Sequence, residues 1–210
     1  MRVTLCLLLC LAAVAADWVE PWYYHDLEGP QFANTTVETI QIRNYAADLW
    51  ANTIIESNDI KEAGSIGFTR LFDYISGANA DKVTIEMTTP VLTTVQPGAG
   101  PNCNSSFTVS FYVPYMYQNE QGPPKPTSED IFIGKIGPLQ VAISEFSGFT
   151  VQSEIIAKTV ELESEVSASS TIKADSSTDI WYFAGYDPPF RITNRHNEVW
   201  IPVTVSESKK

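Results

Sequence analysis

The order of predicted elements repeats once along this chain, and the repeat constrains the fold more than any other feature. In each copy, a strand with alternating apolar residues precedes an amphipathic helix, and further strands follow the helix. Corresponding elements lie about 90–97 positions apart, which indicates a duplicated unit. The first copy comprises a strand over 48–56, a helix that ends at Gly77, and strands over 82–87 and 107–113. The second comprises a strand over 139–146, a helix over 150–167, and strands over 179–186 and 198–203.

Each unit alone is too small to bury its own apolar faces, so the two units must share a core. The chain has 210 residues, of which 44% are hydrophobic, and this is enough for one packed domain. We therefore predict an α+β fold in which the duplicated strand-helix-strand-strand units form one twisted antiparallel β-barrel flanked by two main helices. Residues 91–96 predict a further strand, and a strand over 39–45 is expected to pair with 48–56 across a tight turn.

The first helix is the best-defined element of the sequence. Asn58 or Asp59 is expected to cap it, Glu62 lies in its first turn where a carboxylate meets the positive end of the helix dipole, and Gly77 ends it. Its apolar residues recur at spacings of three and four, which places them on one face. They are Ile60, Ala63, Gly64, Gly67, Phe68, Leu71, Phe72 and Ile75.

The N-terminus has the pattern of a secretory signal peptide over residues 1–16. Arg2 is followed by an apolar run of about a dozen residues, shorter than the roughly 20 that span a membrane, and then by small residues. We predict cleavage, secretion to the extracellular space, an N-terminal arm over 17–36 and one folded domain over 37–205. Cleavage removes Cys6 and Cys10 and leaves Cys103 without an internal disulfide partner.

Two tripeptides fit the acceptor pattern for N-linked glycosylation. They begin at Asn34 and Asn104, and neither has proline at its second position. Because a secreted chain meets the glycosylation machinery, we expect both asparagines to carry a glycan.

Charge and histidine content exclude several classes of function. The formal net charge is −12, which disfavours binding to nucleic acid or to an anionic membrane surface. His25 and His196 are the chain's two histidines, and both are predicted in surface loops without a nucleophile motif. We therefore predict a protein without enzymatic activity and without a metal site. An enzyme would need a polar pocket around a perturbed carboxylate, for which Glu86 or Glu145 are the weak candidates.

The apolar stripe of the first helix has two interpretations. Phe68, Leu71, Phe72 and Ile75, with Met87 in the following strand, either belong to the core or floor an apolar groove for a flat hydrophobic ligand. Arg191 lies beside a proline pair and is a candidate partner for ligand carboxylates at the rim of such a groove. The sequence pattern alone does not decide between core packing and a ligand groove.

A series of longer motifs resembles the SOUL/haem-binding protein family. The resemblance extends in order from about Trp22 to Val203, and the implied domain corresponds to residues 37–205. The motifs are GFTRLFDYISG at 67–77, IEMTTPV at 85–91, VSFYVP at 109–114, PPKP at 123–126, AGYDPP at 184–189 and NEVW at 197–200.

The resemblance implies non-enzymatic, non-covalent binding of haem or a porphyrin. Apolar contacts from the first helix are then expected to hold the ring, with Arg191 near the propionates. Asn44 replaces a histidine that some relatives carry as a proposed iron ligand, and asparagine is a poor iron ligand. Haem is therefore expected to bind without an axial protein ligand. Ser65 replaces a basic residue of other relatives, which removes a possible partner for a propionate. The alternative is a secreted module on the same barrel that has lost tetrapyrrole binding. It would bind a protein partner through the Pro-rich loop over 117–130 and the aromatic N-terminal arm over 17–36. In either case we expect a monomer.

Overall fold

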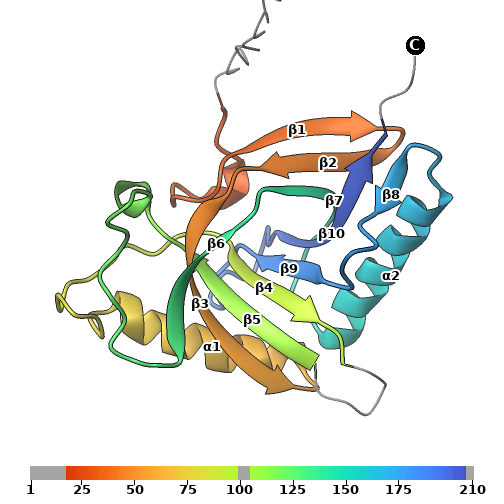
Figure 1. Ribbon diagram of the computed structural model, residues 1–210. Coiled ribbons are helices and arrows are strands. Elements are labelled where there is room, and N and C mark those ends of the chain that lie inside the picture. Colours follow the sequence, from red (N-terminus) through yellow and green to blue (C-terminus); the bar gives the residue numbers. More distant parts are fainter. Residues whose placement is uncertain (1–17, 99–104, 207–210) are drawn as a thin grey trace, which may run out of the picture.

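The computed structural model describes residues 18–98 and 105–206, which form an α+β fold (Figure 1). Ten strands form one curled antiparallel sheet in the order β1-β2-β7-β10-β9-β4-β5-β3-β6, and β8 pairs with β10. The predicted α+β fold with a twisted antiparallel sheet and two main helices is confirmed, but the predicted barrel is not closed, because β1 and β6 at the two ends of the sheet do not pair. Its strands are β1 (Phe32–Val37), β2 (Ile40–Tyr45), β3 (Asp48–Ser57), β4 (Val91–Gln96), β5 (Ser105–Tyr112), β6 (Ile131–Ile136), β7 (Leu139–Phe146), β8 (Ile172–Ala174), β9 (Trp181–Gly185) and β10 (Asn197–Val205).

The sheet order confirms the duplication. If β2, β3, β4 and β5 are exchanged with β6, β7, β9 and β10, the order from β2 to β6 reads the same in reverse. The two halves meet where β4 pairs with β9 in antiparallel register. Helix α1 (Ile60–Ile75) packs on β3 and β5, and α2 (Gln152–Ala168) packs on β7, β8 and β10. Each helix therefore covers its own half of the sheet, as Figure 1 shows.

Two predicted features differ in the structure. Residues 82–87 form no strand. The counterpart of β9 in the first half is therefore β4, because these two strands occupy equivalent positions and pair with each other at the centre of the sheet. The predicted hairpin between 39–45 and 48–56 is also wrong. Strand β2 pairs with β1 and β7, whereas β3 pairs with β5 and β6, so the two halves exchange their neighbouring strands.

The two sides of the sheet carry different cores. Side chains alternate between the sides along a strand, so in β10 Val199 and Ile201 face the helices while Glu198 and Trp200 face away from them. Residues of both helices join the core on the first side, which we call the helix side. On the other side, the N-terminal arm (residues 18–31) places Tyr23 and Tyr24 in an aromatic core, and we call this the arm side.

The ends of α1 form as the sequence predicts. The Asp59 carboxylate accepts hydrogen bonds from the backbone N–H groups of Lys61 and Glu62, and the chain turns away at Gly77, whose φ of +117° suits glycine. Gly67 permits close packing on β5, because a Cβ atom at this position would lie 2.5 Å from Val109. Helix α1 is therefore held tightly against the sheet.

Some predictions concern residues outside the described part of the chain. The predicted signal peptide over 1–16, Cys103 and the acceptor Asn104 all lie there. Within residues 18–98 and 105–206, no helix has the length and apolar character needed to cross a membrane.

Candidate functional site

The predicted stripe on α1 divides into a buried row and an exposed row. Leu71 and Ile75 are buried in the helix-side core, where they contact the sheet. Phe68 and Phe72 lie on the flank of the helix, with 36% and 47% of their surface exposed. For Leu71 and Ile75 the core interpretation therefore holds, whereas the other two side chains are available to a ligand.

Phe68 and Phe72 form an exposed apolar patch of two stacked rings. Their rings are nearly parallel, with centroids 5.7 Å apart and an interplanar angle of 13°. The ring of Phe111 on β5 supports Phe68 from below in an edge-to-face contact at 5.3 Å. A Cβ atom added at Gly64, one turn before Phe68, would meet nothing within 4 Å, so the helix surface beside the pair is open. This geometry suits contact with a planar apolar group.

The sequence analysis did not single out Lys61, which lies two helical turns before Phe68 on the same flank. Its ammonium group donates a hydrogen bond to the carbonyl of Thr150 at 2.8 Å, and the side chain is exposed. A positive charge therefore lies on the same helix flank as the phenylalanine pair. Helical spacing was the signal that could have identified it.

Met87 and Arg191 occupy different surroundings. Met87 is partly buried and packs against the helix-side core. Arg191 lies between β9 and β10, and its Nε atom lies 3.0 Å from Oδ1 of Asp187. It lines a cavity of about 620 Å³ together with Glu20, Pro21, Trp22, His25 and Asp26. No α1 residue contributes to that lining, so the structure does not bring Arg191 into this cavity together with the phenylalanine pair.

The two positions that depart from the resemblance are also defined. The side-chain oxygen of Asn44 accepts a hydrogen bond from Gln140 at 2.9 Å, across the pairing of β2 with β7. Ser65 is exposed on α1, and its carbonyl accepts from Thr69. Of the two weak enzyme candidates, neither Glu86 nor Glu145 lines either of the cavities described in this section.

The arm side contains a buried charged cluster that sequence reasoning missed. The carboxylate of Glu198 is completely buried and accepts hydrogen bonds from Arg43 at 2.9 Å and from Tyr186 and Trp200 at 2.7 Å. Arg43 donates its second nitrogen to Glu145 at 2.9 Å. Arg43, Glu145 and Glu198 lie in three strands that are far apart in the sequence, and only the pairing of β2, β7 and β10 brings them together.

Both histidines join the arm to this region. His196 is buried, not at the surface as predicted; its ring stacks on Tyr23 at 3.8 Å and its Nε2 atom lies 2.6 Å from Glu198. His25 is partly buried and contacts the buried carboxylate of Asp187 at 2.9 Å. The aromatic residues of the arm were the signal that could have indicated the burial of His196, because aromatic side chains pack well against an imidazole ring.

Electrostatics explain how the buried carboxylate remains charged. Burial alone would raise the pKa of Glu198, but the hydrogen bond from His196 and the positive charge of Arg43 outweigh it and hold the pKa below its ordinary value of 4.5. Burial raises the pKa of Tyr186 well above 10, so this phenol stays protonated and donates to Glu198. Every strong partner of the carboxylate is thus supplied by the chain itself.

The same cluster contains, among the described residues, a group of side chains that could hold a metal ion. Glu145, His196 and Glu198 each offer one ligand atom, all within 4.8 Å of one another. The guanidinium of Arg43 already bridges the two carboxylates. A metal ion would therefore have to displace an internal cation, and we assign the cluster a structural role.

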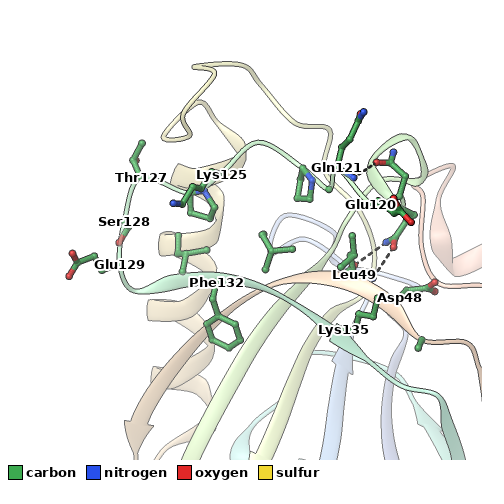
Figure 2. Close-up of a pocket in the computed structure, with 18 residues that line it drawn as sticks. Asp48, Leu49, Glu120, Gln121, Lys125, Thr127, Ser128, Glu129, Phe132 and Lys135 are labelled. Atoms are coloured by element: carbon green, nitrogen blue, oxygen red, sulfur yellow. Dashed lines mark hydrogen bonds between the residues drawn. The ribbon is translucent and has the colours of Figure 1, made fainter.

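A larger cavity lies under the Pro-rich loop, as Figure 2 shows. Its volume is about 1090 Å³, and its lining combines loop residues 118–129 with parts of β3 and β6. The loop is held at both ends: Gln118 bonds to the backbone of Leu49, and the hydroxyl of Thr127 donates to the carbonyl of Ala78 at 2.8 Å. Between them, the phenol of Tyr74 donates to the carbonyl of Pro124 at 2.7 Å. The lining carries charges of both signs, on Asp48, Glu120, Lys125, Glu129 and Lys135.

The predicted glycosylation acceptor Asn34 lies within β1, and its side chain is exposed. In the β1–β2 pairing it stands opposite Arg43. The following two residues of the acceptor tripeptide, Thr35 and Thr36, are exposed as well.

Comparison with known proteins gives one consistent family. Residues 27–202 match the family model described as SOUL heme-binding protein. The chain is 33% identical over 177 residues to heme-binding protein 2 of Homo sapiens, covering 83% of this chain and 82% of that protein. It is 26% identical over 152 residues to heme-binding protein 1 of Mus musculus, covering 72% and 77%. The C-terminal domain of EcmrR shares the fold, with a TM-score of 0.55 and 11% identity over 83% of this chain and 98% of that one.

Proposed function

The chain belongs to the SOUL heme-binding protein family, and from this premise we propose that it binds haem or a related tetrapyrrole without enzymatic activity. The observation that carries the proposal for this chain is the exposed, nearly parallel pair Phe68 and Phe72. Contiguous apolar patches on a protein surface often mark binding sites, whereas singly exposed apolar residues are common. A macrocycle that packs against this patch removes the exposed parts of both rings from water.

The proposed contacts follow from the helix flank. The ring packs on Phe68 and Phe72, whereas Met87 is partly buried against the helix-side core and is not needed for this contact. Lys61 is a better partner for a propionate than Arg191, because Arg191 already pairs with Asp187. Binding is non-covalent, and Asn44, which bonds to Gln140, supplies no axial ligand to an iron atom. Full burial of an exposed phenylalanine contributes about 1.5–3 kcal/mol, and because Phe68 and Phe72 are already partly buried, each contributes about 0.5–1.5 kcal/mol on binding.

We also propose that the protein acts as a secreted monomer in the extracellular space. The apolar segment over residues 3–14 and the small residues before Asp17 support secretion. Secretion places the protein where no cytosolic enzyme competes for a released tetrapyrrole. A role in carrying or sequestering such a molecule fits this location.

Haemin titration of the purified mature protein tests the proposal. We expect a saturable shift of the Soret band, and we expect Phe72→Asp to weaken binding at least tenfold. The matched control is Ile156→Asp on α2, because Ile156 is 46% exposed and lies on the equivalent helix of the other half. This control should bind within about twofold of the original protein. A titration without saturation, or equal weakening by both substitutions, overturns the proposal.

A second candidate function is a secreted module that binds a protein partner. The cavity of about 1090 Å³ under the Pro-rich loop favours it, because both ends of the loop are fixed and the space beneath stays open. Two aromatic residues of the arm, Tyr23 and Tyr24, are buried and are therefore not available to a protein partner. If haemin fails to bind while a partner captured from extracellular fluid is lost on Lys125→Glu, the second function replaces the first.

A further inference from the structure

The open sheet leaves β1 as an edge strand. Among the described residues, β1 pairs only with β2, and the sheet order ends there. An unpaired edge offers a row of backbone N–H and C=O groups to any other strand, and proteins normally protect such edges.

The usual protection is missing from β1. Its sequence, Phe-Ala-Asn-Thr-Thr-Val over residues 32–37, contains no charged residue and no proline. Four of its six residues, Ala33 to Thr36, are exposed. At the opposite end of the sheet, β6 carries the exposed Lys135 and lines a cavity together with the Pro-rich loop. The two edges are therefore treated differently, and only β6 has a charge that opposes strand addition.

Strand β1 instead contains the acceptor tripeptide Asn34-Thr35-Thr36 at its centre. We propose that Asn34 carries an N-linked glycan that covers the free edge of β1 and prevents a second copy of this chain from pairing its own β1 there. A glycan is bulky and strongly hydrated, so it blocks an edge as charged side chains do elsewhere. The inference rests on the proposed secretion, because only a secreted chain receives the glycan.

The geometry of self-pairing explains why this position is effective. Two identical antiparallel strands meet around a two-fold axis, and the same patch of each copy then faces the other. Both Asn34 side chains project from the same face of the joined sheet, close to the new seam between strands about 4.8 Å apart. Two glycans cannot be accommodated side by side at that seam, so glycosylated copies stay apart.

The test uses the full chain, produced through the secretory pathway with Asn104→Gln so that Asn34 is the remaining acceptor. Thr36→Ala destroys the acceptor, and the matched control Thr36→Ser preserves it. We expect the Thr36→Ser protein to lose mass on enzymatic removal of N-glycans and to be monomeric by light scattering. We expect the Thr36→Ala protein to lose no mass and to show at least a doubling of particle mass as its concentration rises.

A second substitution identifies the edge as the contact. Adding Thr35→Lys to the Thr36→Ala protein places a charge on β1, and we expect this to restore the monomer. An unglycosylated Thr36→Ser protein, a monomeric Thr36→Ala protein, or association that survives Thr35→Lys each overturns the inference. Haemin titration of the Thr36→Ala protein tests the proposed tetrapyrrole binding independently of self-association, because Asn34 lies on β1 and the phenylalanine pair lies on α1.

Discussion

The two sides of the sheet bury their residues by different means. On the helix side, packing is apolar, and the surplus apolar surface appears at the flank of α1 as Phe68 and Phe72. On the arm side, an aromatic core surrounds the ion pair of Arg43 and Glu198, and every polar partner of the carboxylate is internal. The polar groups of the buried cluster are already hydrogen-bonded to one another and are not available to a ligand. The exposed rings of Phe68 and Phe72 are available for apolar contacts. The contrast therefore indicates a role in stability for the arm side and supports the proposed binding on the helix side.

The largest effect is expected on the arm side. Glu198→Ala leaves the buried guanidinium of Arg43 without its main partner and removes the acceptor of three further contacts, so we expect a loss of about 3–5 kcal/mol in the free energy of unfolding. Glu145→Ala is the matched control, because Glu145 bonds to the same guanidinium but is 44% exposed. We expect the control to cost about 0–1 kcal/mol. Urea unfolding of the three proteins measures both values.

The difference between these two carboxylates is the informative quantity. Similar losses for Glu198→Ala and Glu145→Ala would show that burial does not govern the cluster. A large loss for Glu198→Ala with unchanged haemin affinity of the folded fraction would confirm that the arm side acts through stability alone.

The next effect separates the buried row of α1 from its exposed row. Leu71→Ala removes a side chain with no exposed surface and leaves a cavity, so we expect a loss of about 2–5 kcal/mol in the free energy of unfolding. Phe72→Ala should cost far less, about 0.5 kcal/mol, because half of the ring is already in water. Haemin affinity should respond in the opposite order, with the larger loss for Phe72→Ala. Thermal unfolding and Soret titration of the same two proteins check the pair, and identical rankings in both assays would contradict it.

Local features of the sequence predicted local structure well. The cap at Asp59, the end at Gly77 and the buried spacing through Leu71 follow from interactions within one helix, so the sequence contains all the information needed. The repeat predicted two equivalent halves for the same reason, since each unit keeps its own order of elements.

Features that depend on distant pairing were not predictable. The hairpin expected between 39–45 and 48–56 failed because β2 gains its partner from the other half, in β7. The same exchange creates the cluster of Arg43 and Glu198, which are 155 positions apart. For the candidate site, spacing identified the stripe but not which of its residues are exposed, because that depends on how the helix is rotated against β5. Phe68 and Phe72 lie at the flank, while Leu71 lies beneath.

The smallest expected effect is the response of the arm side to acid. The pKa of Glu198 is lower in the folded protein than its ordinary value of 4.5, so its charge stabilises the fold above that pH, and this contribution is lost as the pH falls through the lower folded value. Glu198→Gln keeps the shape of the side chain but has no charge to lose. We therefore expect the stability advantage of the original protein over Glu198→Gln to be constant near neutral pH and to shrink as the pH falls below the ordinary carboxyl value of 4.5. Urea unfolding at each pH measures the difference, in which the titration of other carboxylates cancels. An advantage that grows in acid would mean that burial, not Arg43 and His196, dominates the pKa of Glu198, and the arm side would then no longer be a saturated cluster.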